Sequence, residues 1–168
     1  MTSQEMTPAP LNPVDENAEL VFMMGSFEAR FPTDRLYAKN HMWAELREPS
    51  VYRCGLTAYA VRLLQDVYFL DLVIEADMQL KLRQEIGSIE SKKAESSLYS
   101  PLAGQVIVVN DQLLQDPTAI NLDKYGAGWF FDVKSEVPVL LSPTEYIEHL
   151  KAAWEVAQRT IKGQANAE

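Results

Sequence analysis

Residues 86–104 read IGSIESKKAESSLYSPLAG, a polar island with two adjacent lysines between two apolar alternations. The segment QLKLRQEIGSIES enters this island and SLYSPLAGQVIVVN leaves it, and both flanks have the residue pattern of strands. Two such flanks around a short polar centre predict an antiparallel hairpin with ESKKAES at its tip. A lysine there would be exposed on a rigid mount, as a covalently attached swinging cofactor requires. Charged tips also serve simply to discourage edge pairing.

The chain around this hairpin is dominated by β patterns. From residue 36 to residue 137, short segments rich in β-branched and aromatic residues alternate with prolines and glycines. Several short strands at close spacing predict a sandwich or small barrel. The segment TAYAVRLLQ, which begins at Thr57, has helical spacing instead. The sequence therefore predicts a mainly β domain over residues 36–137 with one short internal helix.

The two ends of the chain differ from this domain. Residues 1–18 are rich in proline and polar residues, which predicts a flexible N-terminal arm. The apolar residues within 19–35 predict an ordered extension. Near the other end, SPTE at residues 142–145 has the pattern of a capping box with proline at the first helical position. An apolar stripe follows, so we expect a C-terminal helix over residues 142–162 that packs on the domain.

Composition excludes several classes of protein. A hydrophobic content of 47% over 168 residues is enough for one domain core. A net charge of -9 argues against binding to nucleic acid, which needs clustered cations. Cys54 is the only cysteine, and we expect it to be buried; His41 and His149 lie far apart, so no metal site is predicted. Without a targeting segment or a membrane-spanning run, we expect a cytoplasmic protein.

The lysine pair belongs to an ordered series of short motifs between about residues 36 and 150. In chain order the motifs are His41 with Trp43, Gly55 to Ala60, Glu90 to Ala94, Tyr99 to Pro101, Gly104 to Val106, Val109 with Asn110, Leu113, Pro117, Asn121, Tyr125 with Gly126, and Gly128 with Trp129. This series closely resembles the H proteins of the glycine cleavage system, a family of lipoyl carriers. The resemblance implies a lipoyl-domain-like barrel-sandwich hybrid and a carrier without catalytic residues of its own.

The resemblance also distinguishes the two lysines. The family's lipoylated lysine directly precedes an alanine, follows a glutamate by three positions and precedes a glycine by eleven. Lys93 meets all three conditions and Lys92 does not. The cofactor implied is lipoate, bound covalently as lipoyllysine. The implied site residues are Lys93 for attachment, Glu90, Ser91, Ala94 and Gly104 for the attachment motif, and His41 and Trp43 for the surroundings of the arm.

The implied function is to shuttle an aminomethyl or other lipoyl-bound group between enzymes. The implied partners are a lipoate ligase or lipoyl transferase, then glycine decarboxylase, aminomethyltransferase and dihydrolipoamide dehydrogenase. Acidic residues near the arm, including Glu85, Glu90 and Glu95, would steer docking to basic surfaces or only aid solubility.

One residue departs from the family at a chemically important position. Met42 stands where the family usually has a glutamate that is associated with holding the amine of the loaded arm. Methionine offers no such ion pair. Two alternatives therefore stay open. One is an H-like lipoate-binding protein that serves enzymes of a sulfur-oxidising heterodisulfide-reductase-like pathway, and the other is an unlipoylated H-like binding module.

Overall fold

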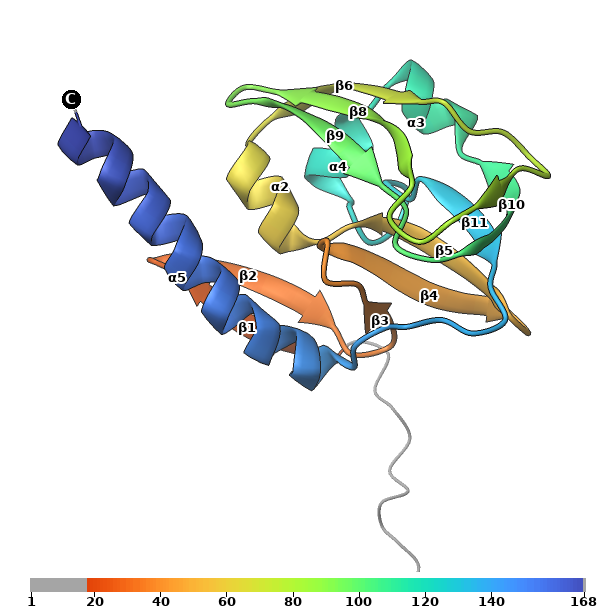
Figure 1. Cartoon of the computed structure of the whole chain (residues 1–168), viewed down its shortest axis with the longest axis horizontal. Coiled ribbons are helices and arrows are strands. Elements are labelled where there is room, and N and C mark those ends of the chain that lie inside the picture. Colours follow the sequence, from red (N-terminus) through yellow and green to blue (C-terminus); the bar gives the residue numbers. More distant parts are fainter. Residues whose placement is uncertain (1–17, 168) are drawn as a thin grey trace, which may run out of the picture.

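The computed structural model describes the backbone of residues 18–167 and the side chains of residues 18–159. The predicted N-terminal arm over residues 1–18 lies outside this range, apart from Ala18. The described chain forms a mainly β body with a long helix along one side (Figure 1). This architecture confirms the predicted fold class, a barrel-sandwich hybrid with helical additions.

The described strands form three sheets. A two-stranded sheet pairs β1 (Glu19–Met24) with β2 (Phe27–Pro32). The other sheets have the strand orders β3-β4-β5-β11-β10-β7 and β6-β8-β9. Their strands are β3 (Leu36–Tyr37), β4 (Met42–Glu48), β5 (Val51–Leu56), β6 (Val67–Leu72), β7 (Gln79–Leu80), β8 (Glu85–Ser91), β9 (Glu95–Tyr99), β10 (Gly104–Val109) and β11 (Phe131–Lys134). The helices are α2 (Ala58–Leu64), α3 (Asp111–Gln115), α4 (Thr118–Leu122) and α5 (Pro143–Ala167).

The main core lies between the six-stranded and three-stranded sheets (Figure 1). Inward-pointing side chains alternate along the strands, apart from irregularities such as the one between Glu85 and Gly87 of β8. Ile86 and Ile89 of β8 and Val133 of β11 are fully buried there. The predicted burial of Cys54 is also confirmed, because its side chain has no exposed surface.

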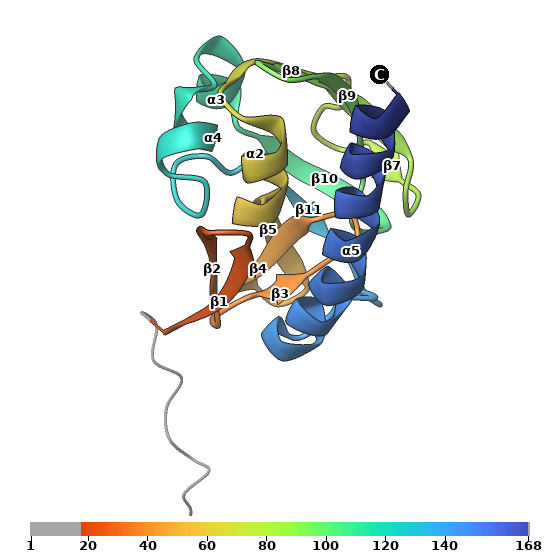
Figure 2. The same cartoon turned by 90° about the vertical axis from the view of Figure 1, so that its left-hand side faces the viewer.

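A second core joins the N-terminal hairpin to α5, and Figure 2 shows the side of the molecule on which both elements lie. The Glu145 N–H donates to Ser142 Oγ at 3.1 Å and the Ser142 N–H donates to Glu145 Oε1 at 2.8 Å, which confirms the predicted capping box. The helix then places Tyr146 and Leu150, both fully buried, in the same cluster as Phe31 of β2. The segment predicted as an ordered extension thus forms a hairpin that packs on α5.

The hairpin is also tied to α2. The Tyr125 hydroxyl accepts a hydrogen bond from the Ala58 N–H at 2.9 Å and donates one to the Arg30 carbonyl at 2.7 Å. Farther along the helix, the Arg62 guanidinium lies over the Phe27 ring at 4.3 Å from its centroid. Residues from both ends of α2 are therefore held by β2.

The helices differ from the sequence-based expectation in two ways. The predicted internal helix is α2, capped by Thr57, but the structure adds α3 and α4. Each has only five residues, too few to establish a helical periodicity. In addition, α5 continues to Ala167, beyond the predicted end at residue 162. No proline interrupts this last stretch, and a single glycine costs a helix only about 1 kcal/mol.

Gly104 has a packing role in the six-stranded sheet. It opens β10 and pairs with Leu80 of β7. A Cβ on Gly104 would stand 2.0 Å from the carbonyl oxygen of Lys134, so only glycine lets the two backbones approach this closely. Lys93 lies in the turn between β8 and β9 of the three-stranded sheet. Packing within the six-stranded sheet therefore requires a glycine at position 104, eleven residues after Lys93.

We predict that Gly104→Ala destabilises the fold by about 2–4 kcal/mol, because either β10 or the facing backbone must move. This corresponds to a fall in Tm of about 5–15 °C, measurable by thermal unfolding followed by circular dichroism. The exposed neighbour supplies the control, and Ala103→Ser should leave the Tm nearly unchanged. Equal Tm values for Gly104→Ala and the wild type would refute the packing role.

Candidate functional site

The lysine pair lies at the tip of an antiparallel hairpin, as predicted. Strands β8 and β9 pair up to Glu90 opposite Glu95, and the Ser91 N–H donates to the Ala94 carbonyl at 2.8 Å. Only two residues, Lys92 and Lys93, remain to turn the chain. Figure 1 shows this tip at the end of the three-stranded sheet, beside the segment that joins α2 to β6.

Ser91 closes this turn with its side chain. Its hydroxyl donates to the Ala94 carbonyl at 3.1 Å and accepts from the N–H groups of Lys93 and Ala94, at 3.3 and 3.2 Å. The Ser91 side chain is buried beneath the turn, with a relative exposure of 5% for the residue. Neither lysine has a positive φ, although the common two-residue hairpin turns require one. The hydroxyl thus satisfies N–H groups in a turn of unusual type.

The tip is also held from outside the hairpin. The Lys92 N–H donates to the carbonyl oxygens of Gln65 and Asp66, at 3.1 and 3.2 Å. These two residues follow α2 and have φ values of 56° and 40°, a region that non-glycine residues rarely adopt. Each such residue costs about 1–3 kcal/mol. The loop after α2 thus adopts a conformation of high backbone energy in which the Gln65 and Asp66 carbonyls reach the turn.

Asn121 fixes the start of β6 below this loop. Its side-chain amide accepts from the Val67 N–H and donates to the Val67 carbonyl, both at 2.9 Å, in the manner of a neighbouring strand. The supports at Gln65, Asp66 and Asn121 were missed by sequence reasoning as parts of the site. Asn121 stood in the motif series, but nothing in the sequence placed it beside β6.

Lys93 presents its amine to solvent. Both lysines of the turn are exposed, and among the described residues neither ammonium group has an ion pair or side-chain hydrogen bond. Lys93 therefore combines a fixed backbone with a free amine. This combination fits the requirement of a covalently attached acyl group, because no internal contact has to be broken to modify the nitrogen.

Only some of the other predicted site residues lie at the turn. Glu90 and Ala94 flank it, but Gly104 lies in the six-stranded sheet, and His41 and Trp43 lie at the start of β4. Trp43 is fully buried, and its Nε1 donates to the Lys124 carbonyl at 3.1 Å. A ring with no exposed surface does not line a space open to an arm. In this structure Trp43 supports the second core.

His41 forms part of the contact between β4 and α5. Its Nδ1 lies 2.9 Å from the Tyr146 hydroxyl, and its ring centroid is 5.7 Å from that of His149. Burial, with a smaller contribution from His149, lowers the pKa of His41 to about 4. The imidazole is therefore neutral at pH 7 and acts as a hydrogen-bonding group in the helix contact.

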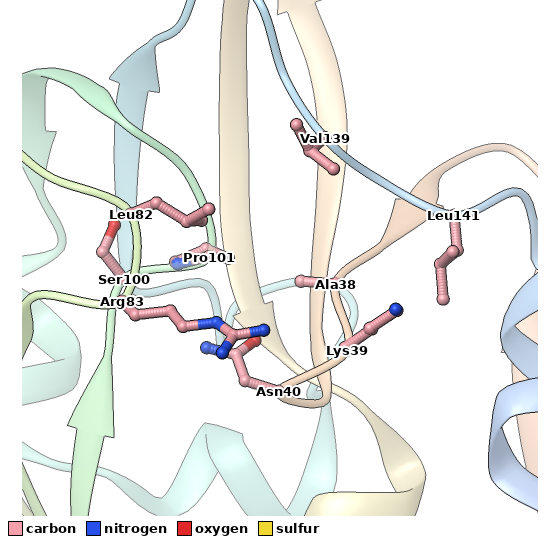
Figure 3. A pocket seen from close by; sticks show the side chains of 9 residues that line it. All are labelled: Ala38, Lys39, Asn40, Leu82, Arg83, Ser100, Pro101, Val139 and Leu141. Atoms are coloured by element: carbon pink, nitrogen blue, oxygen red, sulfur yellow. The ribbon is translucent and has the colours of Figure 1, made fainter.

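The loop before His41 borders a small hollow of about 130 Å³. Figure 3 shows Ala38, Leu82, Pro101 and Val139 among its lining side chains, with Arg83 reaching toward the loop. Asn40 donates to the Tyr99 carbonyl at 2.8 Å and so joins this loop to the last residue of β9. The hollow therefore lies at the end of β9 that is farther from Lys93.

The described part of the chain sets two limits on the site. Among residues 18–159, no three histidine, cysteine, aspartate or glutamate side chains gather closely enough to hold a metal ion. Within the same part of the chain, no helix is both long and apolar enough to span a membrane.

The sandwich and the lysine displayed on its tight turn define the class as a lipoyl-domain-like carrier protein. The family model for the glycine cleavage H-protein matches residues 35–160, and the chain belongs to this family. The predicted family and its lipoyl-carrier function are thereby confirmed, and the chain is a carrier rather than an enzyme. The hairpin β1–β2 precedes the matched range.

Individual relatives agree with this assignment. The chain is 40% identical over 124 residues to the "Probable glycine cleavage system H protein 1" of Saccharolobus solfataricus, covering 71% of this chain and 90% of that protein. It is also 40% identical over 119 residues to the glycine cleavage system H protein of Neisseria gonorrhoeae, covering 68% and 89%. The crystal structure of the H protein from Mycobacterium marinum superimposes with a TM-score of 0.66 at 31% identity, covering 72% of this chain and 99% of that one.

We predict that Ser91→Ala loosens the turn, because it leaves the N–H groups of Lys93 and Ala94 without their acceptor. One such hydrogen bond contributes about 1 kcal/mol, so these two amides should exchange about five- to tenfold faster in deuterium exchange followed by NMR. Ser96→Ala, on the adjacent strand, is the matched control. Unchanged exchange at both amides of Ser91→Ala would show that the hydroxyl does not close the turn.

Proposed function

We propose that Lys93 carries lipoate as lipoyllysine. The observation that supports this most directly is the turn, which fixes the backbone of Lys93 through the Ser91 hydroxyl and leaves its amine exposed. Membership of a lipoyl-carrier family gives independent support. Lys92 shares the exposure but is not followed by the alanine that the attachment motif requires.

The lipoyl group and the protein would have different roles. When bound, lipoate supplies a dithiolane whose sulfurs accept electrons and carry the transferred group. The protein supplies a mount that holds one nitrogen at a defined position. Ser91 fixes the turn, Gln65 and Asp66 hold it to the end of α2, and none of these residues needs to take part in bond making.

The attachment site can be tested by intact mass. Lipoate ligase with lipoate and ATP should add one lipoyl group to the wild type, and Lys93→Arg should abolish this adduct while keeping the charge. Lys92→Arg is the matched control and should be modified fully. An adduct that survives in Lys93→Arg would overturn the assignment. No adduct on the wild type would favour the unlipoylated binding module.

We further propose that the arm carries an aminomethyl group in glycine cleavage. The supporting observation is similarity to proteins named glycine cleavage system H proteins over more than two thirds of the chain. The partners are then a lipoate ligase or lipoyl transferase for attachment, and glycine decarboxylase, aminomethyltransferase and dihydrolipoamide dehydrogenase for turnover.

Met42 favours a second candidate. Its side chain is 1% exposed and belongs to the main core, at the position where the resemblance puts a glutamate. A buried thioether offers no charge-assisted hydrogen bond to an amine. This favours an arm that carries a group other than an amine, as in an H-like lipoate-binding protein of a sulfur-oxidising heterodisulfide-reductase-like pathway.

Exchange of carbon dioxide with glycine distinguishes the two candidates. If the cargo is an aminomethyl group, lipoylated protein should support exchange by a glycine decarboxylase, and Lys93→Arg should reduce exchange to the background without carrier. The measurement is incorporation of labelled carbon dioxide into glycine. The lipoyl group on the wild-type protein is first verified by intact mass. If this protein then gives no more labelled glycine than the reaction without carrier, glycine cleavage is rejected and the second candidate is left.

A further inference from the structure

The outer face of the three-stranded sheet is acidic. One side of β6, β8 and β9 is buried in the main core through Leu70, Ile89 and Leu98. The register places the alternate residues together on the opposite, solvent-facing side. We call this side the acidic face; it consists of Phe69 and Asp71 of β6, Glu85, Ser88 and Glu90 of β8, and Glu95, Ser97 and Tyr99 of β9.

The carboxylates of this face are not ion-paired within the described residues. The three strands hold four carboxylates and neither lysine nor arginine. Among the described residues, no ion pair or side-chain hydrogen bond involves Asp71, Glu85, Glu90 or Glu95. Glu90 and Glu95 stand directly opposite each other, a cross-strand arrangement of like charges that destabilises a sheet. The fold therefore keeps a repulsive pair right beside the turn that carries Lys93.

Exposed aromatic rings border these carboxylates. Phe69 and Tyr99 are 46% and 44% exposed at two ends of the face. Tyr68 is 63% exposed beside Phe69, because an irregularity between Val67 and Phe69 turns two consecutive residues outward. Aromatic residues are enriched at protein interfaces. The combination of aromatic borders and unpaired carboxylates fits a protein partner with a basic surface.

We propose that the acidic face is the docking surface for the enzyme that attaches the lipoyl group, an inference that rests on the proposed function of Lys93. The partner is defined by its chemistry, which is an acyl-adenylate active site surrounded by basic residues. Such an enzyme has to bring its active site to the Lys93 nitrogen itself, at the end of a single side chain. Its surface must therefore contact the hairpin around the turn, whereas later enzymes meet the end of a longer arm.

The reaction explains why contact must be close. The Lys93 Nζ attacks the carbonyl carbon of lipoyl-adenylate, an amide bond forms, the bond from this carbon to the phosphate oxygen breaks, and AMP leaves while the amine proton passes to solvent. The carboxylates flanking the turn would draw a basic enzyme surface toward it and speed productive encounters.

Attachment kinetics test the proposal with two matched double variants. Glu85→Gln/Glu95→Gln removes two charges from the acidic face, and Glu48→Gln/Glu75→Gln removes two from exposed positions in β4 and in the loop after β6 that form no ion pair among the described residues. With purified lipoate ligase, lipoate and ATP, followed by intact mass, we expect the KM of the face variant to rise about tenfold with kcat unchanged. Added salt should raise the KM of the wild type more than that of this variant.

The controls separate docking from folding and from the proposed function. Glu95→Gln alone should raise the Tm by about 1–3 °C, since it relieves the repulsion from Glu90, so slower attachment would not reflect unfolding. A KM equal to wild type in the face variant, or an equal rise in both double variants, would overturn the docking surface. Failure of the wild type to gain any lipoyl mass would instead overturn the assignment of Lys93.

Discussion

The display of Lys93 depends on the closure of a two-residue turn by one buried hydroxyl. Ser91 Oγ joins both sides of the turn, while the carbonyls of Gln65 and Asp66 hold the Lys92 N–H from below. Without these contacts the lysines would sit on an ordinary mobile loop tip. The local cost of two residues with positive φ is tolerated because the surrounding helix and strand hold them in place.

The N-terminal hairpin contributes to this support although it precedes the family match. Its strand β2 contacts the start of α2 through the Tyr125 hydroxyl and the end of α2 through Phe27 and Arg62. The loop that holds the turn follows directly from α2. A continuous series of contacts therefore runs from the extension through one short helix to the lysine, and the added hairpin stabilises the mount as well as the second core.

Sequence reasoning predicted the features that depend on local pattern. The hairpin follows from alternation around a polar centre, and the capping box at Ser142 follows from residue spacing. The choice between the lysines came from the family motif and not from periodicity. The supporting loop could not be predicted, because nothing local marks Gln65 and Asp66 as left-handed. The resemblance put Trp43 near the arm, but a motif match does not reveal that its ring has no exposed surface, so a role beside the arm stays a prediction.

The two-residue turn has a consequence for the accuracy of modification. Lys92 and Lys93 are consecutive and carry the same primary amine. An enzyme therefore cannot distinguish them by the chemistry of the amine alone. A backbone that is tied at Ser91 and at Asp66 gives each amine its own fixed origin in space. For the proposed modification of Lys93, accuracy therefore depends on the rigidity of this turn and of the loop that holds it.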